Sequence, residues 1–280
     1  GVVTADQQNT ERIAIEIEEC RNMGIEVMPP DVNESFGSFT VVTSGTKENK
    51  VVEEGEKVNT IRFGLKAIKN VGEHIAEVLI AERKENGEFN DIFDLLERVL
   101  DKDMNKKSLE SLIKCGGLDQ FGERGYFLGN SEVLLSFNKE ISKEKSSGQS
   151  SLFADAPIMV APPKVTLNPM PEVGQQEKLD WERELLGLYI SEHPFNQFKE
   201  HLKGCTVPLS SLKTGQEKVL TGGVISTIKK ITTKNNEAML FVKIEDAIAN
   251  AEVLVFPRLL KETPTIWIEG KSVLIFGNIS

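Results

Sequence analysis

The chain has 280 residues, of which 39% are hydrophobic and 27% charged, an ordinary composition for a globular protein with room for two or three domains. No run approaches the roughly 20 apolar residues that a membrane-spanning helix needs, and the N-terminus lacks a charged-then-apolar signal segment, so we expect a cytoplasmic protein with no membrane partner. The three cysteines show no spacing typical of a metal site, and the formal net charge of −10 argues at first against nucleic-acid binding.

The charge is distributed unevenly along the chain. From Cys205 to Ser280 there are nine lysine and arginine residues and seven acidic residues, a balance of +2 that leaves −12 for the rest. An acidic body with a mildly basic C-terminal module suits a part of a larger protein whose basic surface lies partly elsewhere. It also suits a protein that holds DNA through backbone amides.

The first 60 residues combine one expected helix with short extended runs. Thr10 can cap a helix that ends at Gly24 and has three apolar residues on one face: Ile13, Ile17 and Cys20. Pro29 and Pro30 stop any helix there. Three runs have strand-like composition and predict a small hairpin or loop excursion: Ile25–Met28, Phe39–Thr43 and Thr60–Phe63.

The segment Leu65–Ala76 has the pattern of two helices joined by a very tight turn, which leaves the first amides of the second helix open to a phosphate. Asn70 tolerates the left-handed backbone of such a turn, Val71 supplies an apolar anchor, and Gly72 lets a phosphate come close. The alternative is an ordinary helical corner without a ligand, and this segment alone leaves both open. The candidate duplex-binding residues are Lys69, Asn70, Val71, Gly72 and Glu73.

Helical periodicity continues from Gly64 to Asn138. Three helices are centred on apolar clusters, at Ile75–Leu79, Ile92–Leu96 and Leu109–Ile113, with Asn90 and Asn105 as expected N-caps and Gly87 as a stop. A second tight hairpin is predicted at Lys114–Asp119, before a further helix from about Glu123. It resembles a duplicate of the first hairpin and adds three candidate phosphate-binding residues: Lys114, Gly116 and Gly117.

From Ile141 to Pro169 the composition shifts to serine, glycine and proline, which predicts a mobile linker. Within it, Leu152 and Phe153 have no obvious core to join, so they either anchor a partner or fold back onto their own domain. The residues of this segment are Gln149, Ser150, Ser151, Leu152 and Phe153. A helix is then expected from Glu177 to Ile190, ended by His193 and Pro194.

The last module alternates in the manner of strands, over Val219–Ile231, Ala238–Glu245, Ala251–Phe256 and Ser272–Ile279, and predicts a small OB-fold barrel. Basic residues around the first hairpin loop, with an aromatic nearby, fit backbone tracking and base stacking on a single strand. A solvated hairpin tip explains the charge equally well. The candidate single-strand-binding residues are Lys229, Lys230, Lys234 and Phe241.

The order of these segments resembles the C-terminal part of the alpha-subunit family of bacterial DNA polymerase III, the C-family replicative polymerases. The similarity covers essentially the whole chain, although Asn70 and Glu192 each replace a glycine that is usual in the family. It is carried by four stretches: Cys20–Asn33, similar to the end of the fingers; Ile61–Gly72, similar to the start of a tandem helix-hairpin-helix domain; Asn105–Asp119, similar to its second hairpin; and Glu184–Ser191 with His193 and Pro194, similar to the connector before the OB domain.

The resemblance implies specific partners. In this family the hairpin domain holds the new duplex, the OB domain lies near the single-stranded template, and an internal peptide binds the sliding clamp; other replicase subunits are further partners. Gln149–Phe153 matches that peptide, which favours the partner-anchor interpretation of the linker. The polymerase chemistry, a nucleotidyl transfer, depends in this family on a palm aspartate cluster that holds magnesium. No such cluster lies in this sequence, so we expect no catalytic residue, no metal site and no cofactor here, and no activity of the chain alone.

We therefore predict an α+β multidomain chain in which a mostly helical tandem helix-hairpin-helix domain precedes a small, truncated OB-fold β-barrel. The expected boundaries are 1–60 for the fingers-like end, 61–140 for the hairpin domain, 141–170 for the linker, 171–204 for a helical connector and 205–280 for the OB-fold. Two alternatives remain open. One is a stand-alone DNA-repair or recombination adaptor, and the other is a protein-interaction scaffold without a role in nucleic-acid binding.

Overall fold

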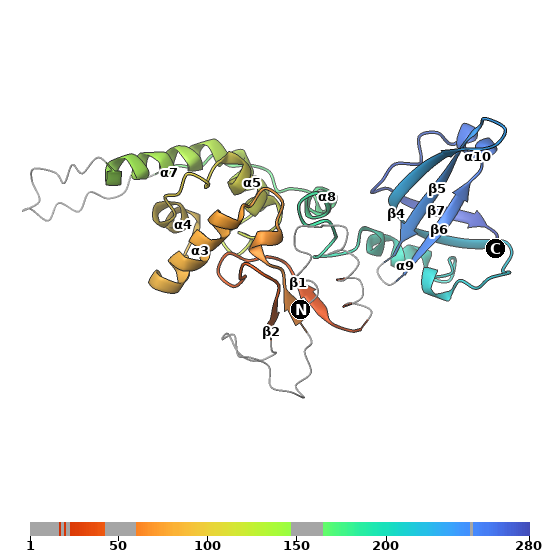
Figure 1. Cartoon of the computed structure of the whole chain (residues 1–280), viewed down its shortest axis with the longest axis horizontal. Coiled ribbons are helices and arrows are strands. Elements are labelled where there is room, and N and C mark those ends of the chain that lie inside the picture. The colour runs from red at the N-terminus through yellow and green to blue at the C-terminus, as the bar shows by residue number, and fades with distance from the viewer. Residues whose placement is uncertain (1–16, 18–19, 21–22, 43–59, 147–164, 247–248) are drawn as a thin grey trace, which may run out of the picture. The chain divides into compact units, whose positions relative to one another are not determined.

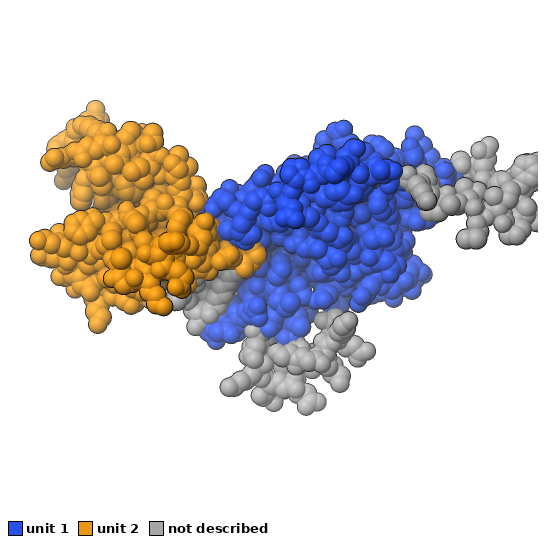
Figure 2. Space-filling view, turned by 180° about the vertical axis from the view of Figure 1, so that it is seen from behind, with its two compact units in different colours: residues 1–190 blue, residues 191–280 orange. Residues whose placement is uncertain are grey.

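The computed structural model describes residues 17, 20, 23–42, 60–146, 165–246 and 249–280 of the chain. It divides into two compact units, residues 1–190 and 191–280, which Figure 2 shows in blue and orange. Each unit is described by itself. Among the described residues, no helix is both long enough and apolar enough to span a membrane.

The first unit contains a small sheet of three short strands, β1 (Glu26–Met28), β2 (Thr40–Val42) and β3 (Thr60–Arg62). The central strand β3 is parallel to β1 and antiparallel to β2. All three lie within the runs predicted from composition. The expected N-cap, Thr10, lies outside the described residues, while Ile17 and Cys20 are helical and buried.

In the described part of the first unit, seven helical segments follow β3, several of them labelled in Figure 1. They are η1 (Leu65–Ala67, a 3-10 turn), α3 (Glu73–Asn86), α4 (Ile92–Arg98), α5 (Lys106–Lys114), α6 (Arg124–Gly129), α7 (Ser131–Ser146) and α8 (Gln175–Leu186). Asn105 caps α5 through a capping box with Ser108, and Gly87 ends α3 with a φ of 84°, both as predicted.

Three local expectations are wrong. The cap of α4 is Asp91, whose carboxylate accepts from the amides of Phe93 and Asp94, and not Asn90. Helix α8 ends at Gly187, which adopts φ 81°, before the predicted stop at His193 and Pro194. The helix α7 continues through Ile141, which is buried, to Ser146, so the predicted linker does not begin at residue 141.

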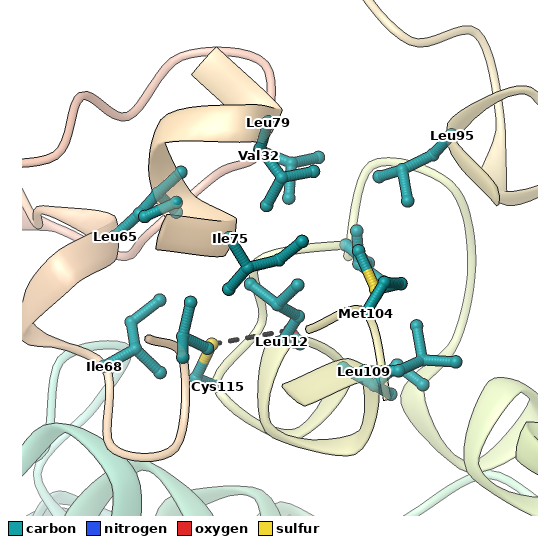
Figure 3. Packing of buried hydrophobic residues seen from close by; sticks show 14 of the residues in the cluster. Val32, Leu65, Ile68, Ile75, Leu79, Leu95, Met104, Leu109, Leu112 and Cys115 are labelled. Atoms are coloured by element: carbon teal, nitrogen blue, oxygen red, sulfur yellow. Dashed lines mark hydrogen bonds between the residues drawn. The ribbon is translucent and has the colours of Figure 1, made fainter. Parts of the chain in front are cut away.

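One hydrophobic core joins the sheet and the helices of the first unit. Figure 3 shows how side chains from the first hairpin, from α3 and from α5 meet in it, with Ile68, Ile75 and Leu112 close together. These three side chains are 2% exposed or less. The two predicted hairpins thus share a single core.

The second unit is a four-stranded antiparallel sheet with short helices. The elements are η2 (Pro194–Phe198), α9 (Lys199–Leu202), η3 (Leu209–Ser211), β4 (Val219–Thr232), β5 (Ala238–Glu245), β6 (Asn250–Val255), α10 (Pro257–Glu262) and β7 (Ser272–Gly277). The strand order is β6-β5-β4-β7, and a register shift between Ile225 and Thr227 marks a bulge in the long strand β4. The predicted fold class is confirmed: a helical hairpin region precedes an OB-like half-barrel.

Candidate nucleic-acid interface

The first hairpin connects η1 to α3 through three residues with distinct conformations. Asn70 has φ 69°, the left-handed conformation that the sequence predicts for it. Val71 is 3% exposed and anchors the turn in the core. Gly72 is the N-cap of α3 in an extended conformation, with φ −66° and ψ 156°. The first arm of the hairpin is only one 3-10 turn, shorter than the helix expected from the pattern.

The N-terminus of α3 has open amide donors. Gly72 makes no side-chain capping bond, and within the described part of the chain no acceptor is found for the backbone N–H groups of Gly72 and Glu73. A Cβ atom added to Gly72 would have no atom within 4 Å. Protein packing therefore does not require glycine here. Open amides at the positive end of a 14-residue helix, with free space in front of them, are suited to a phosphate.

Neighbouring elements hold this turn in place. The amide of Lys69 donates to the carbonyl of Leu185 at 2.9 Å, which ties the hairpin to α8. The side-chain amide of Asn70 donates to Ser111 Oγ at 3.2 Å, which ties it to α5. Because Asn70 also has the left-handed backbone, it has two structural roles besides any contact with a ligand.

Lysine and acidic side chains surround the hairpin. Lys66 Nζ contacts Glu73 at 2.5 Å and Glu77 at 2.6 Å, and the two carboxylates raise the pKa of Lys66 while Lys66 lowers the pKa of Glu77. Because one lysine faces two carboxylates, Lys66 offsets only part of the negative charge of Glu73 and Glu77. Both acids are well exposed, so each pair contributes little to stability.

An imidazole and two carboxylates also meet at the start of α3. His74 Nε2 lies 3.0 Å from Asp101 Oδ2, and one ligand atom each from His74, Asp101 and Asp103 lie within 4.8 Å of one another. The amide of Asp103 donates to Asp101 and, together with His74, lowers the pKa of that carboxyl. The contact links the first turn of α3 to the turn that precedes α5.

The second hairpin has a different local geometry. Gly116 has φ 86°, and its amide donates to the carbonyl of Ile113 at 3.1 Å. The amide of Gly117 donates to the carbonyl of Leu112 at 2.9 Å. Both glycines are buried, and their donors are used to end α5. The two hairpins therefore do not offer equivalent phosphate sites.

A buried arginine covers the second hairpin. Arg124, which is 5% exposed, makes two hydrogen bonds to Asp119, donates to the carbonyl of Lys114 and lies 3.6 Å from Glu182 of α8. A Cβ atom on Gly116 would lie 2.4 Å from this guanidinium. Lys114, a candidate for duplex binding, has its ammonium over the Trp181 ring at 5.6 Å. Glycine at position 116 therefore leaves room for the Arg124 side chain to pack against the turn.

In the second unit, the sheet has a hollow on its outer face. Phe241 of β5 pairs with Lys229 of β4, and both line a hollow of about 580 Å³. Its other lining residues, which the sequence did not single out, are Thr227, Ile231, Lys243 and Glu252. These residues alternate with core residues along β4, β5 and β6. This period-two pattern, counted after the bulge in β4, would have placed them on the same face as Lys229 and Phe241.

The predicted basic cluster is divided by the pleat of the sheet. Lys230 pairs with the core residue Leu240, one step along the strand from Lys229, so it lies on the opposite face. Lys234 is exposed in the turn between β4 and β5. Lys229 and Phe241 are brought together as predicted, whereas Lys230 is not part of that hollow. The segment Gln149–Phe153 lies outside the described residues.

Comparison with known proteins gives one family and a consistent set of relatives. The helix-hairpin-helix motif family matches residues 24–125, which include both hairpins. The chain is 34% identical to the DNA polymerase III subunit alpha of Thermus aquaticus over 92% of its length. It is 31% identical to the same subunit of Escherichia coli strain K12 over 100% and of Bacillus subtilis over 99%. It spans 20%, 23% and 23% of these three relatives, respectively.

Proposed function

Because the chain is homologous over its whole length to DNA polymerase III alpha subunits, we propose that it supplies the DNA-binding and clamp-binding functions of a replicative polymerase. In this proposal the first hairpin holds duplex DNA, the outer face of the half-barrel holds the single-stranded template, and Gln149–Phe153 binds the sliding clamp. The observation that carries the duplex role is the pair of open amides at Gly72 and Glu73, with free space in front of them.

The duplex role is tested by filling the space in front of those amides. Gly72→Val places a branched side chain where a phosphate would approach, and a hydrogen bond to a charged group contributes about 1.5–3 kcal/mol. Since about 1.4 kcal/mol corresponds to a factor of ten, we expect duplex affinity to fall by roughly tenfold or more. Fluorescence anisotropy with a labelled duplex at a fixed salt concentration measures the duplex affinity of the variant and of the wild-type chain.

Gly174→Val is the matched control. Gly174 is the N-cap of α8, with nearly the same backbone angles as Gly72, φ −64° and ψ 150°, and it too has no atom within 4 Å of an added Cβ. Both variants therefore make the same chemical change at a helix start. Equal duplex affinity of the two variants would show that Gly72 has no special place in binding and would remove the hairpin from the proposal.

The single-strand role is supported by the hollow that Lys229, Lys243 and Phe241 line, because cationic side chains track phosphates and an aromatic ring stacks on a base. Removing one stacking ring costs about 1–3 kcal/mol, so Phe241→Ala should weaken single-strand binding by about tenfold. Phe276→Ala is the control, since Phe276 is 69% exposed on β7 and lies outside the hollow. Equal affinities of the two variants would exclude stacking on Phe241.

The clamp role rests on the resemblance of Gln149–Phe153 to the internal clamp-binding peptide of the family. Tethering to a clamp turns rebinding of DNA into an intramolecular event at high effective concentration, which is a physical basis of processivity. Binding of purified clamp to the chain, measured by surface plasmon resonance, should be lost on combining Leu152→Ala with Phe153→Ala. Undiminished binding of that double variant would place the clamp contact elsewhere.

A further inference from the structure

A groove runs between α7 and the segment that connects α4 to α5. It has a volume of about 800 Å³, and its rim carries four lysines from two segments that are far apart in the sequence. They are Lys102 and Lys106 near the start of α5, and Lys139 and Lys143 on α7. Only two acidic residues, Asp101 and Glu132, line the same groove, so its lining is basic in a chain whose formal net charge is −10.

Ion pairs offset part of the positive charge on the rim. Lys106 contacts Glu132 at 3.0 Å, which offsets one lysine. Asp101 is turned toward His74, with Oδ2 at 3.0 Å from the imidazole. Lys102 and Lys139 are exposed and make no ion pair with any residue that the structure describes.

The groove floor is packed and its polar groups are satisfied. Met104 and Leu135 are buried, and the side-chain amide of Asn138 donates to the carbonyls of Leu96 and Val99. Asn105 accepts from the amides of Lys107 and Ser108, so two of the donors at this helix start are already used. A ligand in the groove would meet lysine side chains on a rigid floor.

The lysines of α7 are suited to an extended anion. Lys139 and Lys143 are four residues apart, so they lie on one face of the helix about 6 Å apart along its axis. Long, flexible ammonium side chains at such intervals can follow a row of phosphates without fixed geometry. An isolated small anion would need only one of them.

The groove also adjoins the first hairpin. Asp101 lines the groove and forms a hydrogen bond with His74, which lies in the first turn of α3, two residues after Gly72. The second hairpin cannot provide the next phosphate contact through its glycine amides, because those of Gly116 and Gly117 end α5. A further contact of this unit with a duplex held at Gly72 would therefore come from another surface.

We propose that the groove between α5 and α7 is that contact, and that Lys102, Lys139 and Lys143 bind the phosphate backbone of the duplex that the first hairpin holds. The inference rests on the proposed duplex role and extends it to a second surface. The two hairpins then have different roles. The first hairpin binds DNA through its amides, the second hairpin stabilises the fold, and the lysines beside the second hairpin bind the DNA phosphate backbone.

The test is the salt dependence of duplex affinity of the whole chain carrying Lys102→Gln, Lys139→Gln and Lys143→Gln together. Each lysine–phosphate contact contributes about 0.9 to the slope of log K against log salt concentration, so the slope should become shallower by about 2.7. The affinity at low salt should fall at least fivefold. A control chain with Lys199→Gln, Lys203→Gln and Lys213→Gln has the same net charge and changes only exposed lysines of the second unit.

The outcomes separate the two proposals. If the groove variant keeps the wild-type slope while Gly72→Val weakens binding, the groove inference is overturned and the duplex role stands. When neither variant changes duplex affinity, both fail. If the groove variant keeps its duplex slope but no longer binds purified sliding clamp, the occupant of the groove is a protein surface and the inference is again overturned. Matched circular dichroism spectra and melting temperatures of the variants verify that the fold is retained.

Discussion

Asn70 determines the geometry of the first hairpin at the scale of a single residue. Its φ of 69° is a conformation that most residues adopt only at a cost of about 1–2 kcal/mol, and its side chain adds a bond to Ser111. The resemblance to DNA polymerase III alpha subunits implies glycine at this position. Asparagine supplies the same backbone conformation and links the hairpin to α5, but it leaves a side chain beside the proposed phosphate site.

Substitutions of Asn70 should separate these effects. Asn70→Ala loses both the left-handed tolerance and the bond to Ser111, so we expect unfolding free energy in urea to fall by about 1–3 kcal/mol. Asn70→Gly loses only the bond, so it should be less destabilising and should bind duplex more tightly than wild type. An Asn70→Ala chain as stable as Asn70→Gly would show that the backbone conformation carries no cost.

Cys115 gives a second prediction at this scale. The thiol is fully buried within the second hairpin, and burial raises its pKa from an ordinary 9.0 to about 12. In the unfolded chain the Cys115 thiol ionises near pH 9, whereas in the folded chain it stays protonated to about pH 12. The free energy of unfolding should therefore fall as pH rises from about 9 toward 12. A Cys115→Ser chain should lose this alkaline decline in urea unfolding; an unchanged pH profile in the variant would contradict the assignment.

At the scale of elements, two hairpins with similar sequence spacing differ in which backbone amides they leave open. At the second hairpin the amides of Gly116 and Gly117 bond to α5 carbonyls, and Arg124 covers the turn through hydrogen bonds to Asp119. At the first hairpin the corresponding space is open. Duplication of a pattern in sequence therefore does not duplicate its surface chemistry.

Arg124→Ala should be strongly destabilising. It removes the guanidinium that lies 3.6 Å from the carboxylate of Glu182, which is 0% exposed, and loss of one partner of a buried ion pair typically costs about 3–5 kcal/mol. Urea unfolding of the chain should show a midpoint shift confined to the transition of the first unit. Lys178→Ala is the comparison, because Lys178 forms a partly exposed pair with Glu123, and we expect it to cost about 1 kcal/mol or less. Equal effects of the two substitutions would contradict the structural role of Arg124.

Local patterns predicted the elements well, since turn residues and alternation act over a few neighbours. Asn70, Gly87 and the strands of the half-barrel are where glycine, asparagine and period-two alternation place them. The cover that Arg124 forms over the second hairpin could not be predicted, because Arg124 and Glu182 meet only in the folded unit. For the same reason the continuation of α7 past Ile141 was missed, as burial of that side chain depends on tertiary packing.

At the scale of the whole molecule, an acidic chain is proposed to bind DNA. Its formal net charge of −10 repels phosphates at long range, so binding depends on local features: open amides at Gly72 and Glu73, and basic side chains gathered in grooves. The repulsion is screened by salt, whereas amide donors contribute no counterion release. The balance of +2 in residues 205–280 agrees with a separate single-strand surface in the second unit.

Amide hydrogen exchange, followed residue by residue with and without a saturating duplex, measures whether the first hairpin binds DNA through its amides. The amides of Gly72 and Glu73 should exchange fast in the free chain and become protected when duplex binds. The amides of Gly116 and Gly117, already bonded to α5 carbonyls, should be slow in both states. Duplex binding that leaves the Gly72 and Glu73 amides unprotected, or that protects those of Gly116 and Gly117 instead, would contradict a duplex contact through the first hairpin.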